Sequence, residues 1–282
     1  MKPISPLRPS PIAGTWYDNR PEKLAAEVDA YLDAAVLPKK DAEAIALIAP
    51  HAGYRYSGAV AGYAFAAVRD RVFDVVAILS PMHAPHPEPF LTSGHFAYKT
   101  PLGNVPIARD LVNATDERLR AALGFGVTPV LRDREHSLEI ELPFLQRSLA
   151  AEFDLLPLMI RSTDPHELAV LGAALAEVLR GKKALLVAST DLSHFYPQEI
   201  AEKLDAEMLR QIASFSPEGV LRAEETGRGF ACGRGAVAAV LHAARALGAD
   251  SVEILHYATS GDATGDYTSV VGYGAAAVYK EP

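Results

Sequence analysis

The chain has 282 residues, 49% of them hydrophobic and 22% charged, and it carries a formal net charge of −8 at pH 7. These values are typical of a globular, enzyme-like protein that can bury a sizeable core. The acidic balance disfavours a nucleic-acid binder, which needs a basic surface to neutralise phosphates. No apolar run reaches the roughly 20 residues of a membrane span, and the Pro-rich start has no signal-peptide apolar region. We therefore expect a cytoplasmic protein without a membrane segment.

The first segment with a distinctive composition is 8–17, whose prolines and glycine predict an irregular loop. It carries Trp16, the only tryptophan of the chain. Two interpretations stay open for Trp16: it covers the edge of the core, or it forms part of a binding platform. A helix is then predicted to begin near Pro21, because Leu24, Val28 and Leu32 follow at helical spacing.

Three apolar segments each end in residue types that bind metals or transfer protons. They are 44–49 before His51, 73–80 before His83, and 184–189 before Asp191 and His194. Short apolar runs of this kind predict buried parallel strands. In open α/β sheets, ligands lie just beyond the carboxyl ends of such strands. Because the three ends share one topological position, we expect a shared functional site there.

The segment after His51 is predicted to turn and enter a helix that covers about 59–68. Gly53 and Gly58 are expected to allow a tight turn and a close approach to a ligand. Tyr54 lies in this turn and is a candidate substrate-binding residue. Further on, residues 94–104 are rich in turn formers and predict a hairpin. The histidines at 86 and 95 are assigned to the rim or the surface.

The segment 135–147 is dense in groups that do chemistry. On a helix, His136 and Glu139 would share one face and point together into a pocket. His136 is therefore a candidate catalytic residue and Glu139 a candidate substrate-binding residue. The alternative is a solvated helix start, with its acids near the positive end of the helix dipole.

The second half of the chain alternates strands and helices. Residues 153–160 predict a strand, and a helix over 165–180 follows, with Asp164 as its N-cap and Pro165 in its first turn. The strand at 184–189 comes next, so we expect a parallel crossover. Further helices are predicted over 199–215 and 236–247, and two strands over 252–279 around a Gly-rich loop. The pattern predicts one α/β domain over residues 1–282, with a central mostly parallel or mixed sheet flanked by helices.

Cys232, the single cysteine, excludes an intrachain disulfide and precedes the helix at 236–247. A helix start stabilises a thiolate, so a lowered thiol pKa and a role as nucleophile or metal ligand are expected. The neighbouring glycines favour an accessible loop. The alternative is a buried, inert cysteine.

Six motifs in order resemble the Memo family, whose microbial members are called AmmeMemoRadiSam system protein B. They are RPSPIAGTWY at 8–17, PHAGYRYSG at 50–58, SPMH at 80–83, EHSLEIELPFL at 135–145, STDLSH at 189–194 and ACGR at 231–234. The resemblance implies a single α/β domain similar to class III extradiol dioxygenases, with a non-haem iron pocket. The family name implies functional association with a radical S-adenosylmethionine enzyme and an AMMECR-type protein.

By position, the resemblance implies that His51, His83 and Cys232 bind the metal, with Asp191 and His194 beside them. The chain departs from the family at 80–84, SPMHA, where Gly-Pro-Ser-His-His is frequent. The thiolate also replaces the carboxylate of extradiol enzymes, so activity does not transfer with the fold.

Several functions remain open at this point. In the first, Fe(II) is bound by this trio and His194 acts as acid or base, oriented by Asp191, with His136, Glu139, Trp16 and Tyr54 lining a pocket for a small molecule or peptide. In the second, the protein is a redox or carrier protein without turnover, because such a ligand set also suits copper. A peptide-binding or protein-binding module using the same cleft and a zinc hydrolase are further alternatives.

Overall fold

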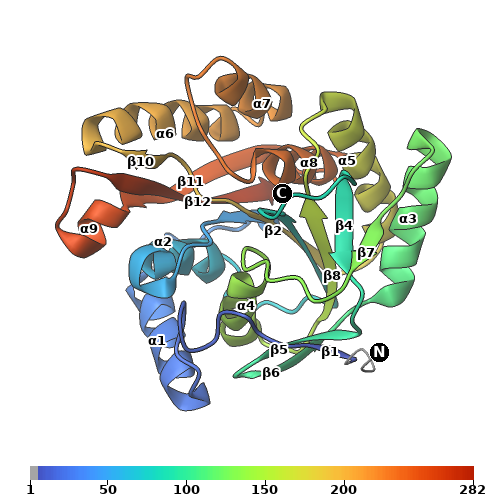
Figure 1. The fold of residues 1–282 in the computed structure, drawn as a ribbon, viewed down its shortest axis with the longest axis horizontal. Helices are drawn as coiled ribbons and strands as arrows, with labels where there is room; N and C mark the ends of the chain where they lie inside the picture. The colour runs from blue at the N-terminus through green and yellow to red at the C-terminus, as the bar shows by residue number, and fades with distance from the viewer. Residues whose placement is uncertain (1–5) are drawn as a thin grey trace.

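The computed structural model describes residues 6–282 (Figure 1). Residues 1–5, which make up most of the Pro-rich start, lie outside the described part. Among the helices of residues 6–282, none has the length and apolar character needed to cross a bilayer.

A mixed sheet forms the centre of the described chain, with the strand order β10-β12-β2-β9-β3-β8-β4-β7 and β11 paired to β12. The strands are β2 (Glu43–Ala49), β3 (Val75–Pro81), β4 (Phe90–Ser93), β7 (Thr128–Val130), β8 (Asp154–Ile160), β9 (Ala184–Ser189), β10 (His194–Tyr196), β11 (Ser251–Thr259) and β12 (Val270–Lys280). Strands β2, β9, β3 and β8 are parallel, whereas β12 and β4 run antiparallel to their neighbours β2 and β8. The predicted α/β domain with a mixed central sheet is thereby confirmed.

The helices cover both faces of this sheet. They are α1 (Pro21–Ala34), α2 (Tyr54–Ala66), α3 (Arg109–Leu123), α4 (Leu142–Ser148), α5 (Pro165–Leu179), α6 (Gln198–Ala213), α7 (Pro217–Glu225), α8 (Arg234–Ala246) and α9 (Ser260–Thr264), with a 3-10 turn η1 (Glu139–Glu141). Helix α8 packs on β9, β3 and β2 beside α5, and α2 packs on β2 and β12 beside α1 and α4. Figure 1 shows these two groups on opposite sides of the sheet. Every residue of β3 is buried, as expected for a strand covered on both faces.

Several local predictions agree with the structure. Asp164 caps α5 by accepting hydrogen bonds from the backbone N–H groups of His166 and Glu167. The predicted hairpin consists of β5 (Ala97–Thr100) and β6 (Gly103–Pro106), which are antiparallel, and β1 (Leu7–Arg8) joins β5 in a separate small sheet. The crossover from β8 through α5 to β9 is parallel, although β3 lies between the two strands.

Other predictions were wrong. Helix α2 begins at Tyr54 and not near 59, so Gly58 lies inside the helix. A Cβ atom at Gly58 would lie 2.5 Å from the Tyr31 ring of α1, which means that this glycine serves helix packing and not a ligand. His95 is buried, with 3% of its surface exposed, because the segment before β5 packs into the interior.

Candidate metal centre

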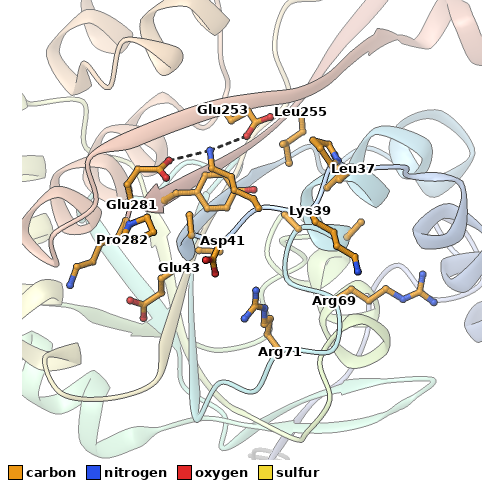
Figure 2. Close-up of a pocket in the computed structure, with 18 of the residues that line it drawn as sticks. Leu37, Lys39, Asp41, Glu43, Arg69, Arg71, Glu253, Leu255, Glu281 and Pro282 are labelled. Carbon is orange, nitrogen blue, oxygen red and sulfur yellow. Dashed lines mark hydrogen bonds and ion pairs between the residues drawn. The ribbon is translucent and has the colours of Figure 1, made fainter.

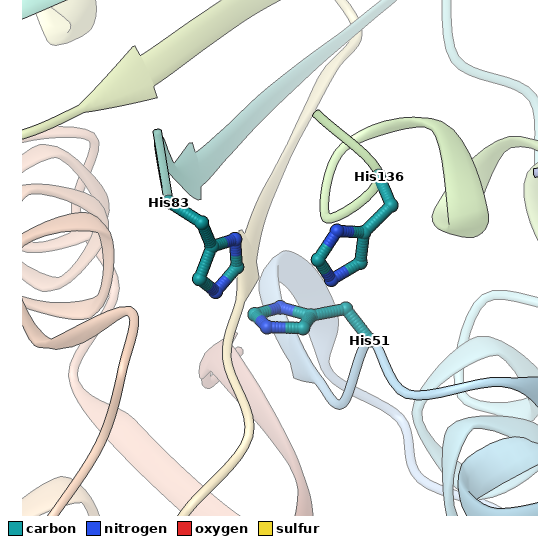
Figure 3. A group of neighbouring side chains, drawn as sticks. All are labelled: His51, His83 and His136. Carbon is teal, nitrogen blue, oxygen red and sulfur yellow. The ribbon is translucent and has the colours of Figure 1, made fainter. Parts of the chain in front are cut away.

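The carboxyl ends of β2 and β3 each deliver a histidine to the same place. His51 follows β2 and His83 follows β3, each at the second position after the strand. His136, from the loop between β7 and η1, completes the group. One ring nitrogen of each histidine lies within 4.8 Å of those of the other two. Figure 3 shows the three side chains converging from separate segments. His51 and His83, two of the residues expected at a shared strand-end site, therefore lie together there.

His83 is oriented by Glu135, a buried residue that the sequence analysis did not single out. Nδ1 of His83 lies 2.9 Å from Oε1 of Glu135, and the backbone N–H of His83 donates to Oε2 at 2.7 Å. Burial alone would raise the pKa of Glu135, but the hydrogen bond and the charge of His83 outweigh it and hold this pKa well below 4.5. The ionised carboxylate accepts the Nδ1–H, and although burial acts to lower the pKa of His83, this contact raises it above 6.5. A metal that binds at Nε2 of His83 must therefore displace the proton there.

The other two imidazoles are neutral near pH 7. Burial lowers the pKa of His51 well below 6.5 and that of His136 to about 4. His136 stacks on His83, with 4.8 Å between ring centroids, and packs against Trp16 at 4.1 Å. Neutral imidazoles are the form that metals bind, and Trp16 forms a wall of the group.

Cys232 lies next to His51, with Sγ 3.2 Å from Nε2. Helix α8 can start this close to β9 because residue 233 is a glycine. A Cβ atom at this position would lie only 2.3 Å from the carbonyl oxygen of Ser189 and would clash with it. The expected accessible loop with a lowered thiol pKa is not found. Cys232 is half-buried, and burial together with the charge of Asp191 raises the pKa of its thiol above 9. The metal-free form is therefore a thiol at neutral pH.

Asp191 and His194 both lie close to the histidine group but do not bond to each other. Asp191 accepts the backbone N–H of His51 at 2.7 Å, and burial raises its pKa to about 7. Nδ1 of His194 lies 2.8 Å from the carbonyl oxygen of Leu192, and its ring packs against Phe230. The expected orientation of His194 by Asp191 is thus wrong, because the carbonyl of Leu192 takes that place.

Glu139 does not share a helical face with His136, because residues 135–138 are not helical. The Glu139 side chain is fully buried and accepts hydrogen bonds from Arg8, Ser10 and Tyr17 at 2.5–2.7 Å. Tyr54, the other substrate-binding candidate, is also buried.

The hydroxyl of Tyr54 donates to the carbonyl of Ile140 at 2.8 Å. Both candidates are therefore buried and hydrogen-bonded within the fold. The sequence does hold a signal that the carboxylates of Glu135, Glu139 and Glu141 are buried. Three acids stand among the mostly apolar residues of 135–145, and charges in such a setting are buried and paired.

A cavity of about 1030 Å³ lies away from the histidine group (Figure 2). It is lined by Glu43, Ala44, Phe73, Lys183 and Ala184, which stand at or next to the amino ends of β2, β3 and β9. The histidine group lies at the opposite, carboxyl ends of these strands. The charges of this cavity are mixed and partly paired, as in the ion pairs of Lys40 with two glutamates. Within residues 6–282, the side chains whose donor atoms are placed to hold a metal are the three histidines, so the candidate metal centre is the histidine group and not this cavity.

The chain folds into a mixed β-sheet covered by helices, and three histidines meet at the carboxyl ends of its central strands. It is therefore an α/β protein with a candidate metal centre. The family model described as Memo-like protein matches residues 8–277. The chain belongs to this Memo family. It is 32% identical over 271 residues to a MEMO1 family protein of Methanosarcina mazei, and 34% identical over 271 residues to one of Methanococcoides burtonii, covering 95% of this chain and 98% of each relative. A MEMO1 family protein of Methanocaldococcus jannaschii is 31% identical over 294 residues, covering 98% of this chain and the whole relative.

Proposed function

We propose that this Memo-family protein binds a redox-active transition metal at the histidine group and uses it in oxidoreductase chemistry on a small molecule. Fe(II) is the metal that we propose first. The observation that carries the proposal is that ring nitrogens of His51, His83 and His136 lie within 4.8 Å of one another. The donor set fits a metal, because two of these imidazoles are held neutral by burial and the third is oriented by Glu135.

The ligand set is the point at which the family resemblance and the geometry differ. The resemblance implies His51, His83 and Cys232, whereas the nitrogen geometry groups His136 with the first two. Both sets share His51 and His83, and Cys232 Sγ lies 3.2 Å from Nε2 of His51. We propose the two histidines that are common to both sets as the fixed ligands, with His136 and Cys232 as the residues to be distinguished by experiment.

The side chains around the metal position supply the remaining functions. A bound iron would act as a Lewis acid and redox centre with open positions for ligands. His83 is 40% exposed, so a substrate can reach the group from solvent. Trp16 offers a flat apolar wall beside His136. His194 donates Nδ1–H to a carbonyl, which leaves Nε2 free to accept a proton.

A second candidate function is metal carriage or redox storage without turnover. The observation that favours it is the sulfur atom next to His51, because thiolate and imidazole together suit copper and zinc as well as iron. A cytoplasmic location and association with a radical S-adenosylmethionine enzyme and an AMMECR-type protein are further proposals from the family resemblance.

The test is metal analysis of the full chain purified anaerobically and reconstituted separately with Fe(II), Cu(I) and Zn(II). We expect tight iron binding that His51→Ala and His83→Ala abolish. His86→Ala is the matched control, since His86 lies in the same segment as His83 but outside the group, and it should retain the metal. Failure of the wild-type chain to retain any of the three metals would overturn the proposal.

Two further variants separate the ligand sets. His136→Ala should lower metal content if the geometric group is correct, and Cys232→Ser should lower it if the sulfur binds. Oxygen uptake by the iron-loaded protein with added catechols then separates turnover from carriage. No uptake with any catechol favours the carrier.

A further inference from the structure

The Ser189 hydroxyl, at the end of β9, lies within hydrogen-bond distance of three groups. Its Oγ is 2.6 Å from the carbonyl oxygen of Ser137, 2.6 Å from Oε1 of Glu141 and 3.0 Å from Nδ1 of His51. A hydroxyl has one proton to donate and two lone pairs to accept with. The three contacts can all be hydrogen bonds only if the protons are distributed in one particular way.

The carbonyl of Ser137 carries no proton, so the single proton of Ser189 must go to it. Glu141 and His51 must then each donate to Ser189. Glu141 can donate only as a neutral carboxylic acid, and His51 only with its proton on Nδ1. In any other distribution, at least one of these close contacts places two lone pairs against each other.

The surroundings of Glu141 support the neutral form. Glu141 is buried, with 1% of its surface exposed, and within residues 6–282 its Oε2 has no hydrogen-bond partner. An ionised carboxylate needs several donors when it is buried, but among the described residues the Glu141 carboxyl group has a single hydrogen-bond partner, the Ser189 hydroxyl. Burial raises the pKa of Glu141 well above 4.5, even though the Ser189 contact acts to lower it.

We propose that Glu141 is a positioning residue which, as a neutral acid acting through Ser189, fixes His51 as the Nδ1–H tautomer. The Nε2 lone pair of His51 then faces the metal position. The value of this arrangement for metal binding rests on the proposed function, but the tautomer is a property of the metal-free chain.

In its neutral form, His83 has the same tautomer for a different reason. Its Nδ1 contacts Glu135 directly at 2.9 Å, and that carboxylate is ionised. Two carboxyl groups of the segment 135–141 thus serve the two strand-end histidines: the ionised Glu135 contacts His83, and the neutral Glu141 acts on His51 through Ser189. Such a neutral relay orients His51 without a second buried negative charge, whose desolvation would be costly.

The first experiment needs no metal. The infrared difference spectrum of metal-free wild type minus Glu141→Gln near neutral pH should contain the carbonyl band of a protonated carboxylic acid. The difference is necessary because Asp191 also has a raised pKa. A carboxylate band in its place means that Glu141 is ionised and overturns the proposal.

The second experiment is NMR of protein labelled with ¹⁵N-histidine, which reads the tautomer of His51 directly. Wild type and Glu141→Gln should give the Nδ1–H form, because the glutamine amide also donates to Ser189. Ser189→Ala should give a mixture of tautomers. An Nε2–H form of His51 in wild type overturns the proposal.

The third experiment measures affinity for Zn²⁺, a probe without redox chemistry. Glu141→Gln should bind as wild type does, whereas Ser189→Ala and Glu141→Leu should bind about 10–100-fold more weakly. Unchanged affinity in Ser189→Ala would contradict the positioning role. If wild type binds no metal, the proposed function fails, while the infrared and NMR results still decide the tautomer. Glu141→Gln retains size and neutrality, so the test survives if Glu141→Leu does not fold.

Discussion

Nε2 of His51 lies 3.2 Å from Sγ of Cys232, although 181 positions separate the two residues in the chain. The contact exists because β2 and β9 are neighbouring strands and α8 starts against the end of β9. With the His51 proton on Nδ1, its Nε2 is an acceptor. The thiol of Cys232, whose pKa is raised by burial, is then the donor in the metal-free protein.

Proton release tests whether this sulfur becomes a metal ligand. A thiol must lose its proton to bind a metal, and Cys232 holds that proton at neutral pH. Addition of Zn²⁺ to the metal-free protein in weak buffer should therefore release about one proton per bound ion more from wild type than from Cys232→Ser. A pH-sensitive dye measures the difference. Equal release from both proteins would remove Cys232 from the ligand set.

Removal of the negative charge of Glu135 should weaken metal binding. Its carboxylate accepts Nδ1–H of His83 and the backbone N–H groups of His83, His136 and Ser137. Loss of such a partner typically costs about 10–100-fold in metal affinity. We expect this loss for Glu135→Gln in a competition titration with a chelator. Glu88→Gln is the control, because Glu88 lies close along the chain to His83 and outside the histidine group. Equal affinities of the two variants would refute the role of Glu135.

Arg8 should be important for stability. Its side chain is 2% exposed and pairs with Asp133 and Glu139, which are also buried. Arg8→Ala leaves these two carboxylates without their partner, which typically costs about 3–5 kcal/mol of unfolding free energy. Urea denaturation monitored by circular dichroism measures this.

The comparison for Arg8 is a surface ion pair. Arg147 pairs with Asp29 where both side chains remain 36–40% exposed. Arg147→Ala should therefore change the free energy of unfolding by no more than about 1 kcal/mol. A loss in Arg8→Ala as small as that in Arg147→Ala would show that the buried network around Glu139 does not stabilise the fold.

Asp205 should make the protein less stable as the pH rises. It is fully buried, it accepts hydrogen bonds from the backbone N–H of Ser193 and the hydroxyl of Tyr257, and burial raises its pKa above 3.8. Folding therefore takes up a proton between the unfolded and the folded pKa, and the free energy of unfolding falls as pH rises through this window.

Asp205→Asn stays neutral and should lack this part of the fall. Relative to wild type, the variant should gain stability between about pH 4 and about pH 7, as measured by urea denaturation at both values. Parallel pH dependences of the two proteins would contradict the prediction.

The strand-end pattern was visible in the sequence because a buried parallel strand is a continuous apolar run. His51 and His83 follow such runs directly, so their meeting at one edge of the sheet follows from parallel pairing. The position of His136 in the group was harder to predict from the sequence. The sequence suggested a helix over its segment, on which His136 and Glu139 would share one face. In the structure, the carboxylate of Glu135 accepts the N–H groups of His136 and Ser137 and competes with helix formation.

The sequence by itself determined the α/β class, the family and two of the three clustered histidines, since these depend on local apolar patterns and on motif order. Only the tertiary structure decided that His136 joins the group, that Glu139 turns away to Arg8, and that Glu141 reaches His51 through Ser189. The physical reason is that a side chain's direction and its proton depend on partners distant in the chain. Hydrophobic periodicity records which face of an element is buried, and not which donor meets which acceptor there.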